Sequence, residues 1–172
     1  MMRLNSLKKT YKAAKEVAEH FGGVFLMNKN EIVRRSGLTP PTVYKAIRIL
    51  EEYGILEEVK MGFYTVRENE VLEWPLFDKP IRWEIVKRAM EIIASKQPCK
   101  IGELPIPNAT LHNYLRDLEE AGIIQRMRTG RWSYIFAKDK EKFMKLCDFL
   151  KAKYDRIVTI EEMREGKVKI KD

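Results

Sequence analysis

One stretch of the chain is repeated 68 residues further along, and this repeat constrains the fold more than any other feature. Residues 42–64 read TVYKAIRILEEYGILEEVKMGFY and residues 110–132 read TLHNYLRDLEEAGIIQRMRTGRW, which align without a gap. Eight of the 23 aligned positions are identical: Thr42/Thr110, Arg48/Arg116, Leu50/Leu118, Glu51/Glu119, Glu52/Glu120, Gly54/Gly122, Ile55/Ile123 and Gly62/Gly130. A chain of 172 residues has room for two small domains. The repeat therefore predicts two copies of one structural unit.

The repeated unit begins with the apolar spacing of a helix. The residues on its predicted buried face are Val43, Ala46, Ile47, Leu50 and Tyr53. Thr39 suits the N-cap and Pro40 suits the first turn, where a proline needs no backbone hydrogen bond. Gly54 follows the last turn, where a residue with positive φ is favoured. These signals predict a helix over about 40–53.

A change of period after the glycine predicts a β-hairpin. Residues 55–60 and 63–67 are strand candidates around Met61-Gly62, and residues 123–128 and 132–137 flank Thr129-Gly130 in the second copy. A helix, a glycine and then a hairpin is the order of a recognition helix followed by a wing.

The segments before each repeat are predicted to be helical. Residues 5–20 form an amphipathic helix, and Asn28 with Glu31 forms a capping box for a short helix that ends near Arg35. In the second copy residues 81–95 supply the first helix, and prolines leave room for about one turn around 101–104. The apolar stripe of the first helix comprises Leu4, Leu7, Tyr11, Ala14, Ala18 and Phe21.

These elements predict an α+β fold that is mainly α with small hairpin wings. We expect a first winged-helix domain over 1–70, a linker over 71–80, and a second winged-helix domain over 81–138. A C-terminal helix over 139–155 and a tail complete the chain to residue 172. The linker contains Leu72, Trp74, Leu76 and Phe77, so we expect it to pack down rather than to act as a free tether.

The segment SGLTPPTVYKAIRILEEYGIL resembles the turn and recognition helix of winged-helix repressors of the multiple-antibiotic-resistance and arsenic-resistance types. The matching elements are Ser36, Gly37, Leu38, Thr39, Thr42-Val43, Leu50-Glu51 and Gly54-Ile55-Leu56. The match covers residues 28–67 well and residues 98–137 less well. The resemblance implies two tandem winged helix-turn-helix domains, double-stranded DNA as the partner, and a role in transcription regulation.

The resemblance also implies that the exposed residues of each second helix enter the major groove. The first copy offers Pro41, Thr42, Tyr44, Lys45 and Arg48, with Arg34 and Arg35 before them as clamps on the DNA backbone. The second copy offers Asn108, Thr110, His112, Asn113 and Arg116, and its wing adds Arg126, Arg128 and Arg131. The first wing carries only Lys60 and Arg67 as basic residues.

Composition agrees with a polyanionic partner and gives no sign of catalysis. Lys and Arg number 33 against 25 for Asp and Glu, which gives a net charge of +8. Phosphate-binding loops, nucleophile elbows and zinc-protease motifs are absent from the sequence. The two cysteines, Cys99 and Cys147, form no C-x-x-C pair, although a bridge between them is possible. We expect no enzyme activity, no cofactor, no metal site, no membrane association, and a cytoplasmic location.

Two other interpretations of the repeat stay open. Tandem winged helices also resemble parts of transcription factor E, an RNA polymerase III subunit, and chromosome-segregation and endosomal-sorting subunits, several of which bind protein. A protein partner in the transcription machinery is therefore an alternative, and a plasmid or virus replication initiator is another. The apolar stripe of the first helix, and that of the last helix with Phe143, Leu146, Leu150 and Tyr154, further predict a homodimer through these terminal helices.

Overall fold

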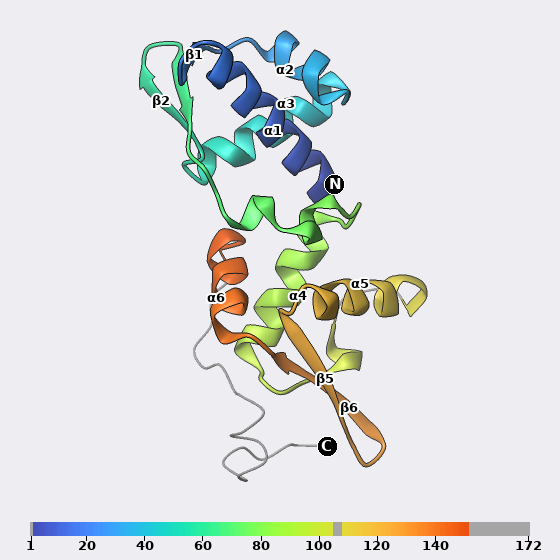
Figure 1. The fold of residues 1–172 in the computed structure, drawn as a ribbon. Helices are drawn as coiled ribbons and strands as arrows, with labels where there is room; N and C mark the ends of the chain where they lie inside the picture. The colour runs from blue at the N-terminus through green and yellow to red at the C-terminus, as the bar shows by residue number, and fades with distance from the viewer. Residues whose placement is uncertain (1, 105–107, 152–172) are drawn as a thin grey trace. The chain divides into compact units, whose positions relative to one another are not determined.

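The computed structural model describes residues 2–104 and 108–151, without the side chains of residues 108, 109 and 129. The chain divides into two compact units, Met1–Trp83 and Glu84–Asp172, which are shown in Figure 1. Among the described residues there are six α-helices and two three-stranded antiparallel sheets. The predicted α+β class is therefore correct.

The first unit follows the order helix, strand, helix, helix, hairpin. Its elements are α1 (Leu4–His20), β1 (Val24–Leu26), α2 (Lys29–Ser36), α3 (Pro40–Glu52), β2 (Leu56–Lys60) and β3 (Phe63–Val66). The sheet has the order β1-β3-β2, so β3 is central and β1 and β2 are its edges. The predicted helices and hairpin are present, whereas β1 was not predicted from the sequence.

Local capping explains where the helices of the first unit begin and end. The Asn28 side chain accepts a hydrogen bond from the Glu31 backbone N–H at 3.1 Å, which is the N-cap half of the predicted capping box, whereas the Glu31 carboxylate bonds to Arg34 and Arg35. Gly37 ends α2 in the left-handed conformation. Thr39 is the N-cap of α3, Pro40 occupies its first turn, and Gly54 follows it with a φ of 71°.

The core of the first unit lies between α1, α2, α3 and the sheet. Leu7, Tyr11, Ile32, Val43 and Leu50 are fully buried. In α1 and α3 these residues belong to apolar stripes that recur every three or four positions, whereas α2 contributes Ile32 alone.

The apolar stripe of α1 is part of this core and is not an exposed dimer seam. Leu4, Leu7, Tyr11, Ala14 and Ala18 are all buried within the single chain. Phe21 is the exposed member of the stripe. Of the predicted stripe of the last helix, Phe143, Leu146 and Leu150 are also buried, and Tyr154 lies outside the described residues. The stripes from which a homodimer was predicted therefore have no free apolar surface apart from Phe21 among the residues that the structure describes.

The predicted linker packs down, as its apolar residues indicate. Two 3-10 helices, η1 (Val71–Glu73) and η2 (Pro75–Asp78), bury Val71, Leu72, Leu76 and Phe77. The buried Lys8 of α1 holds this segment. Its Nζ lies 2.8 Å from an Asp78 carboxylate oxygen and donates to the backbone carbonyls of Glu73 and Trp74. The segment thus belongs to the first unit.

The second unit repeats the order of elements found in the first. It contains α4 (Trp83–Ser95), β4 (Cys99–Lys100), the 3-10 helix η3 (Ile101–Glu103), α5 (Asn108–Glu120), β5 (Ile124–Thr129), β6 (Trp132–Ala137) and α6 (Lys140–Phe149). Its sheet has the order β4-β6-β5, in which β6 takes the central place of β3. The single turn expected around 101–104 is η3, and β4 was not predicted.

The last helix is shorter than predicted. An Asp139 side chain caps α6 by accepting from the Lys142 backbone N–H at 3.1 Å. The helix ends at Phe149, and Lys151 has a φ of 56°. A positive φ at a residue with a side chain interrupts a right-handed helix, so the predicted extent of 139–155 is wrong at its C-terminal end. The predicted tail, 156–172, lies outside the described residues.

Gly54 gives a direct test of the turn that separates α3 from its hairpin. Adding a side chain there meets no atom within 4 Å, so the cost of Gly54→Ala comes from the backbone conformation alone. We expect Gly54→Ala to lower the free energy of unfolding by about 1–2 kcal/mol in urea titrations. Gly54→Asn should cost less, because asparagine tolerates positive φ. Equal losses in both variants would contradict this explanation.

Candidate nucleic-acid interface

One side of α3 is exposed because the opposite side supplies the core. Val43, Ala46, Ile47 and Leu50 are buried, and this leaves the intervening positions in solvent. The predicted contact residues on the exposed side are Pro41, Tyr44, Lys45 and Arg48, and Thr42 is partly buried. The structure thus brings the predicted residues of this helix to one face.

Contacts around the start of α3 constrain two of these side chains. The Thr42 hydroxyl forms a 3.0 Å hydrogen bond with the hydroxyl of Thr39, the N-cap. The Lys29 ammonium of α2 lies 5.3 Å from the centre of the Tyr44 ring, within the range of a cation–π contact. Lys29 therefore adds a cation beside the exposed side of α3 that sequence reasoning missed.

Charge is unevenly distributed along α3 and α5. Lys45 and Arg48 precede Glu51 and Glu52 in α3, and Arg116 precedes Glu119 and Glu120 in α5. The acidic residues therefore belong to the last turns of both helices. The earlier turns, which reach base edges when such a helix enters the major groove, carry the basic and neutral polar residues.

The predicted backbone clamp of Arg34 and Arg35 is occupied by acidic partners. Arg34 donates to both carboxylate oxygens of Glu31, and Arg35 Nε donates to Glu31 at 2.8 Å. These bonds lower the pKa of Glu31 to about 2. Arg35 also lies 3.5 Å from Glu16 of α1. Both guanidinium groups are therefore committed to contacts within α2 and toward α1, which reduces the charge that they offer to phosphate.

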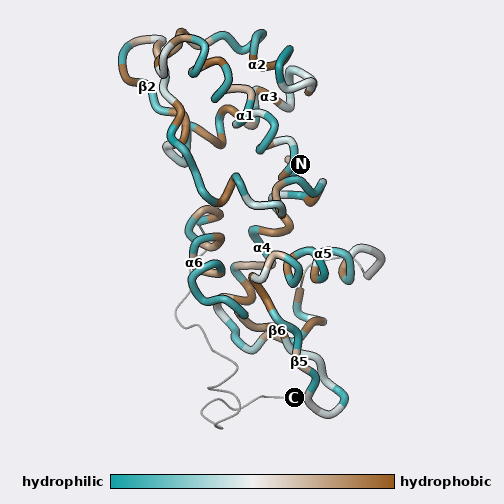
Figure 2. The backbone as a smooth tube through the Cα atoms, viewed as in Figure 1, coloured by the Kyte–Doolittle hydropathy of each residue, from teal (hydrophilic) through white to brown (hydrophobic). Residues whose placement is uncertain are grey.

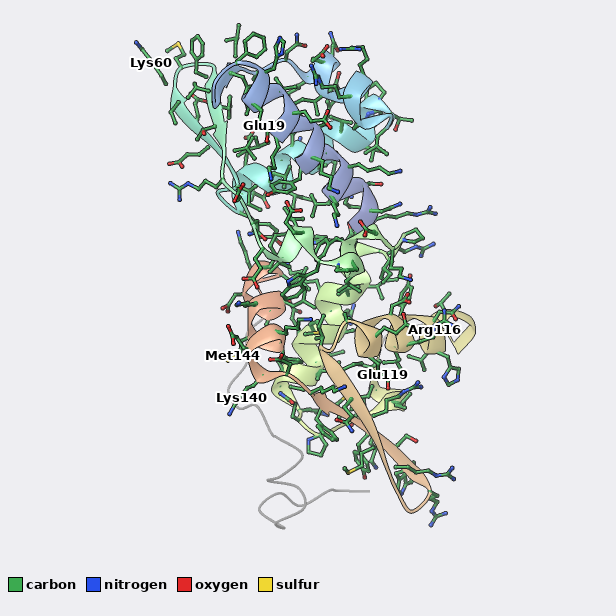
Figure 3. The ribbon with its side chains drawn as sticks, viewed as in Figure 1. Glu19, Lys60, Arg116, Glu119, Lys140 and Met144 are labelled. Atoms are coloured by element: carbon green, nitrogen blue, oxygen red, sulfur yellow. The ribbon has the colours of Figure 1, made fainter. Side chains whose placement is uncertain are left out.

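The exposed side of α5 matches that of α3 in position but is less basic. Thr110, His112, Asn113 and Arg116 are exposed, whereas Leu111, Leu115 and Leu118 are buried. Arg116 is seen on α5 in Figure 3. Asn108 begins the helix, and its side chain lies outside the described part of the structure.

The hairpin of the second unit gathers cations around an exposed tryptophan. Trp132 is 38% exposed. The Lys100 ammonium lies 4.3 Å from the centre of its ring, and the Arg131 guanidinium lies 6.0 Å from it. Arg128 is exposed and its Nε donates to the Gly130 carbonyl at 3.3 Å. Lys100 was missed from the sequence because β4, which carries it, becomes recognisable only through its pairing with β6.

Arg126 differs from the other two predicted arginines of this hairpin. Its Nε lies 2.5 Å from a carboxylate oxygen of Glu119 in α5, and the side chain is partly buried. This ion pair ties β5 to the end of α5. The structure therefore brings Arg128 and Arg131 together with Trp132, and holds Arg126 against its own helix.

The hairpin of the first unit carries acidic and exposed apolar side chains instead of a cluster of cations. Its Tyr64 hydroxyl donates to Glu58 at 2.9 Å, which raises the pKa of Tyr64 to about 12. Arg67 forms an ion pair with Glu57. Lys60, at the tip in Figure 3, stands between exposed Val59 and Met61. Figure 2 shows brown, hydrophobic segments near this tip, whereas the tip of the second hairpin is white and teal.

The described residues contain no cluster of metal-ligating side chains, no disulfide and no membrane-spanning helix. Over 2–104 and 108–151, no three His, Cys, Asp or Glu side chains are placed to hold a metal ion. Cys99 and Cys147 are free, buried thiols, so the possible bridge between them is not formed. In the same ranges, every helix falls short of the length and apolarity that a membrane span requires.

The chain matches no protein-family model, no curated protein and no solved structure.

The buried cysteines lead to a prediction about thiol reactivity. Burial raises the pKa of each thiol to about 12, and a hydrogen bond to Glu103 contributes at Cys99. Since the thiolate is the reactive form, we expect neither cysteine to react with Ellman's reagent in the native protein at pH 8. Both should react in roughly 6–8 M urea, a concentration that unfolds most small domains. Rapid reaction of one thiol in the native state would reveal an accessible cysteine.

Proposed function

We propose that this protein binds double-stranded DNA through two tandem winged helix-turn-helix units and acts as a transcription regulator. The observation that carries the proposal is the cluster formed by exposed Arg128, Arg131 and Trp132 on the second hairpin and by half-buried Lys100 on the neighbouring β4. Such a cluster suits a phosphate backbone or a minor groove, where arginine and lysine are attracted by negative potential.

The second helices α3 and α5 suit the reading of bases. An α-helix fits the major groove of B-form DNA, and the side chains of its early turns reach the base edges. Lys45 stands on the exposed side of α3 and offers donors to guanine acceptors or phosphate. His112, Asn113 and Arg116 occupy the same side of α5. The recurrence of this arrangement in both units supports a protein with two DNA-contacting helices.

The two units contribute unequally to this proposal. In the first unit Arg34, Arg35 and Arg67 all have carboxylate partners, and the hairpin carries Glu57 and Glu58. In the second unit Arg126 is paired with Glu119, but Lys100 and Arg131 contact an aromatic ring and Arg128 contacts a backbone carbonyl group. We therefore assign most of the backbone attraction to the second unit, and assign base contact in the first unit to α3.

Salt dependence tests whether phosphate contacts dominate. Each phosphate neutralised by Lys or Arg releases condensed counterions, so log K falls with log salt by roughly 0.9 per contact. We expect a slope of about −2 to −4, which corresponds to two to four such contacts. Fluorescence anisotropy with a labelled random-sequence duplex at several salt concentrations measures it. An affinity that does not change with salt would contradict the proposal.

Lys45→Ala and Arg128→Ala should affect DNA affinity in different ways, which binding measurements with a panel of duplexes of different sequence can reveal. Lys45→Ala removes a base-reading side chain, so it should relax preference at one base pair by about 1–3 kcal/mol while weak, non-specific binding persists. Arg128→Ala removes a backbone contact, so it should weaken binding to all sequences alike and reduce the salt slope by about 1.

Matched controls separate these effects from a general loss of charge. Lys9→Ala removes one exposed cation from α1, away from the proposed interface, and should bind DNA as the wild type does. Arg128→Lys keeps the charge and should retain most of the affinity. If Lys45→Ala and Arg128→Ala both bind like the wild type while folding normally, the assigned faces are wrong.

A further inference from the structure

The outer edge of β1 has backbone groups directed away from the sheet. β1 pairs with β3 in an antiparallel register that joins Val24 to Thr65, Phe25 to Tyr64 and Leu26 to Phe63. The Met27 N–H donates to the Gly62 carbonyl at 3.0 Å and continues this register. Hydrogen-bonded pairs alternate along such a ladder. The backbone N–H and C=O of Phe25 therefore point toward β3, whereas those of Val24 and Leu26 point outward.

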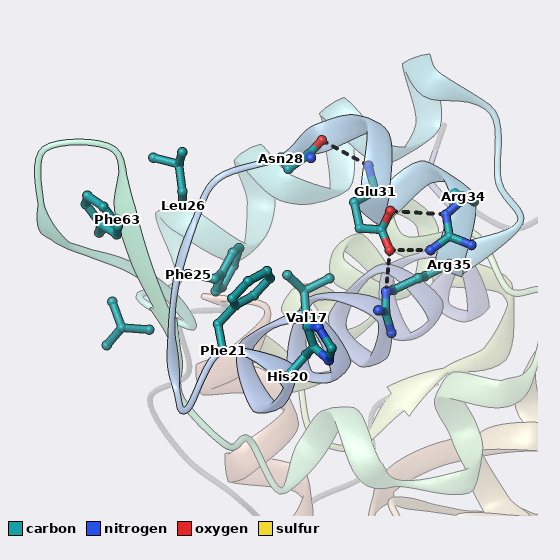
Figure 4. A pocket seen from close by; sticks show the side chains of 11 residues that line it. Val17, His20, Phe21, Phe25, Leu26, Asn28, Glu31, Arg34, Arg35 and Phe63 are labelled. Carbon is teal, nitrogen blue, oxygen red and sulfur yellow. Dashed lines mark hydrogen bonds and ion pairs between the residues drawn. The ribbon is translucent and has the colours of Figure 1, made fainter.

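A pocket of about 730 Å³ lies along this edge. Val24, Phe25 and Leu26 all line it, together with residues of α1, α2 and β3. Successive side chains of a strand point to opposite faces of a sheet, so a single pocket borders all three only along the strand edge. We call this pocket the β1 groove. Figure 4 shows Phe21, Phe25 and Val17 on one side of the strand, and Leu26 and Phe63 on the other.

The walls of the β1 groove are apolar to an unusual degree for an exposed surface. Phe21 is 64% exposed and Leu26 is 62% exposed, and Val24 and Phe63 are also exposed. Clusters of exposed large apolar residues mark interaction sites more often than scattered single ones do. A charged residue is the usual protection of an edge strand, and β1 carries none.

The α2 side of the β1 groove is polar and offers the exposed guanidinium of Arg34. Its charged residues are Glu31, Arg34 and Arg35, and Arg35 is engaged by both Glu31 and Glu16. The Arg34 side chain is 71% exposed and uses its Nε and Nη2 for Glu31. A guanidinium has five N–H donors, so Arg34 retains donors for a second carboxylate.

We propose that the β1 groove binds an extended peptide segment of a partner protein, which joins the first sheet as a fourth strand beside β1. The backbone of the segment would bond to the outward groups of Val24 and Leu26, as in other cases of strand addition. Alternate apolar side chains would enter the pocket beside Phe21 and Phe25, and one acidic side chain would pair with Arg34.

The shape of the groove favours a single peptide over a second copy of this chain. The outward edge of β1 is flanked by Val17 and Phe21 of the α1 end and by the arginines of α2. If two copies paired through β1, each would bring these walls against those of the other. A lone extended segment carries no such walls, and its acidic residue complements the remaining donors of the exposed Arg34 guanidinium.

A peptide selection identifies the sequence that the groove prefers. A phage-displayed library of random dodecapeptides is selected for binding to the immobilised full-length protein. Peptides that also bind the Leu26→Pro variant are removed from the library. Proline removes the outward N–H of residue 26, and it leaves the β1–β3 bonds intact because those use Phe25 and Met27. We expect enriched peptides with apolar residues at alternate positions and one Asp or Glu.

The enriched peptides are then synthesised and titrated by fluorescence anisotropy against matched variants. Leu26→Ala shortens the side chain but keeps the N–H, so it should weaken binding about threefold or less. Leu26→Pro should weaken binding about tenfold or more, because it also removes a backbone hydrogen bond and blocks the strand edge. Circular dichroism confirms that both variants are folded.

A second comparison tests the acidic residue. Replacing the Asp or Glu of the peptide by Asn or Gln should weaken binding several-fold to the wild type, and should have little effect with Arg34→Gln. This coupling is expected only if the two side chains meet.

Three outcomes would overturn the proposal. One is a selection that enriches no peptide over the Leu26→Pro bait. Another is equal binding by Leu26→Ala and Leu26→Pro, which would make the groove an apolar pocket without strand addition. The third is a dimer by light scattering that Leu26→Pro converts to a monomer, since the occupant would then be a second copy. None of these depends on DNA binding, so the proposed function is tested separately.

Discussion

The exposed sides of α3 and α5 are set by one constraint, the burial of the opposite face of each helix. Val43, Ile47 and Leu50 in α3, and Leu111, Leu115 and Leu118 in α5, are withdrawn from water, which fixes the rotation of each helix about its axis. The side chains between them are then presented outward as a set. Because the same constraint acts in both units, the two helices present equivalent positions even where the residues differ.

Ion pairing decides how much of the formal charge each surface offers. Glu31 engages Arg34 and Arg35, Glu57 engages Arg67, and Glu119 engages Arg126. Exposed pairs of this kind add little stability, but they reduce the field that a cation projects. Around Trp132, by contrast, Lys100 and Arg131 face an aromatic ring that leaves their charge intact. These cations therefore keep more of their charge than the paired arginines of the first unit do.

The repeated units have diverged most where they project from their cores. The core positions keep their apolar character, since any polar replacement there would leave an unsatisfied group. The hairpins are free of that constraint: one carries Glu57, Glu58 and exposed apolar residues, and the other carries exposed arginines. Under the two proposals above, this difference gives the units separate roles. The second unit attracts nucleic acid, and the β1 groove of the first unit binds a peptide.

The sequence by itself determined the repeat, the limits of α2 and α3, the glycine turn and the two hairpins, because helical periodicity, capping and positive φ act over a few neighbouring residues. It did not reveal β1 and β4, which have three and two residues and are defined by pairing with β3 and β6 far along the chain. It also did not reveal which arginines are paired or that the α1 stripe is core. Those features depend on which distant side chains meet, and only the tertiary structure brings Glu119 to Arg126 and Lys100 to Trp132.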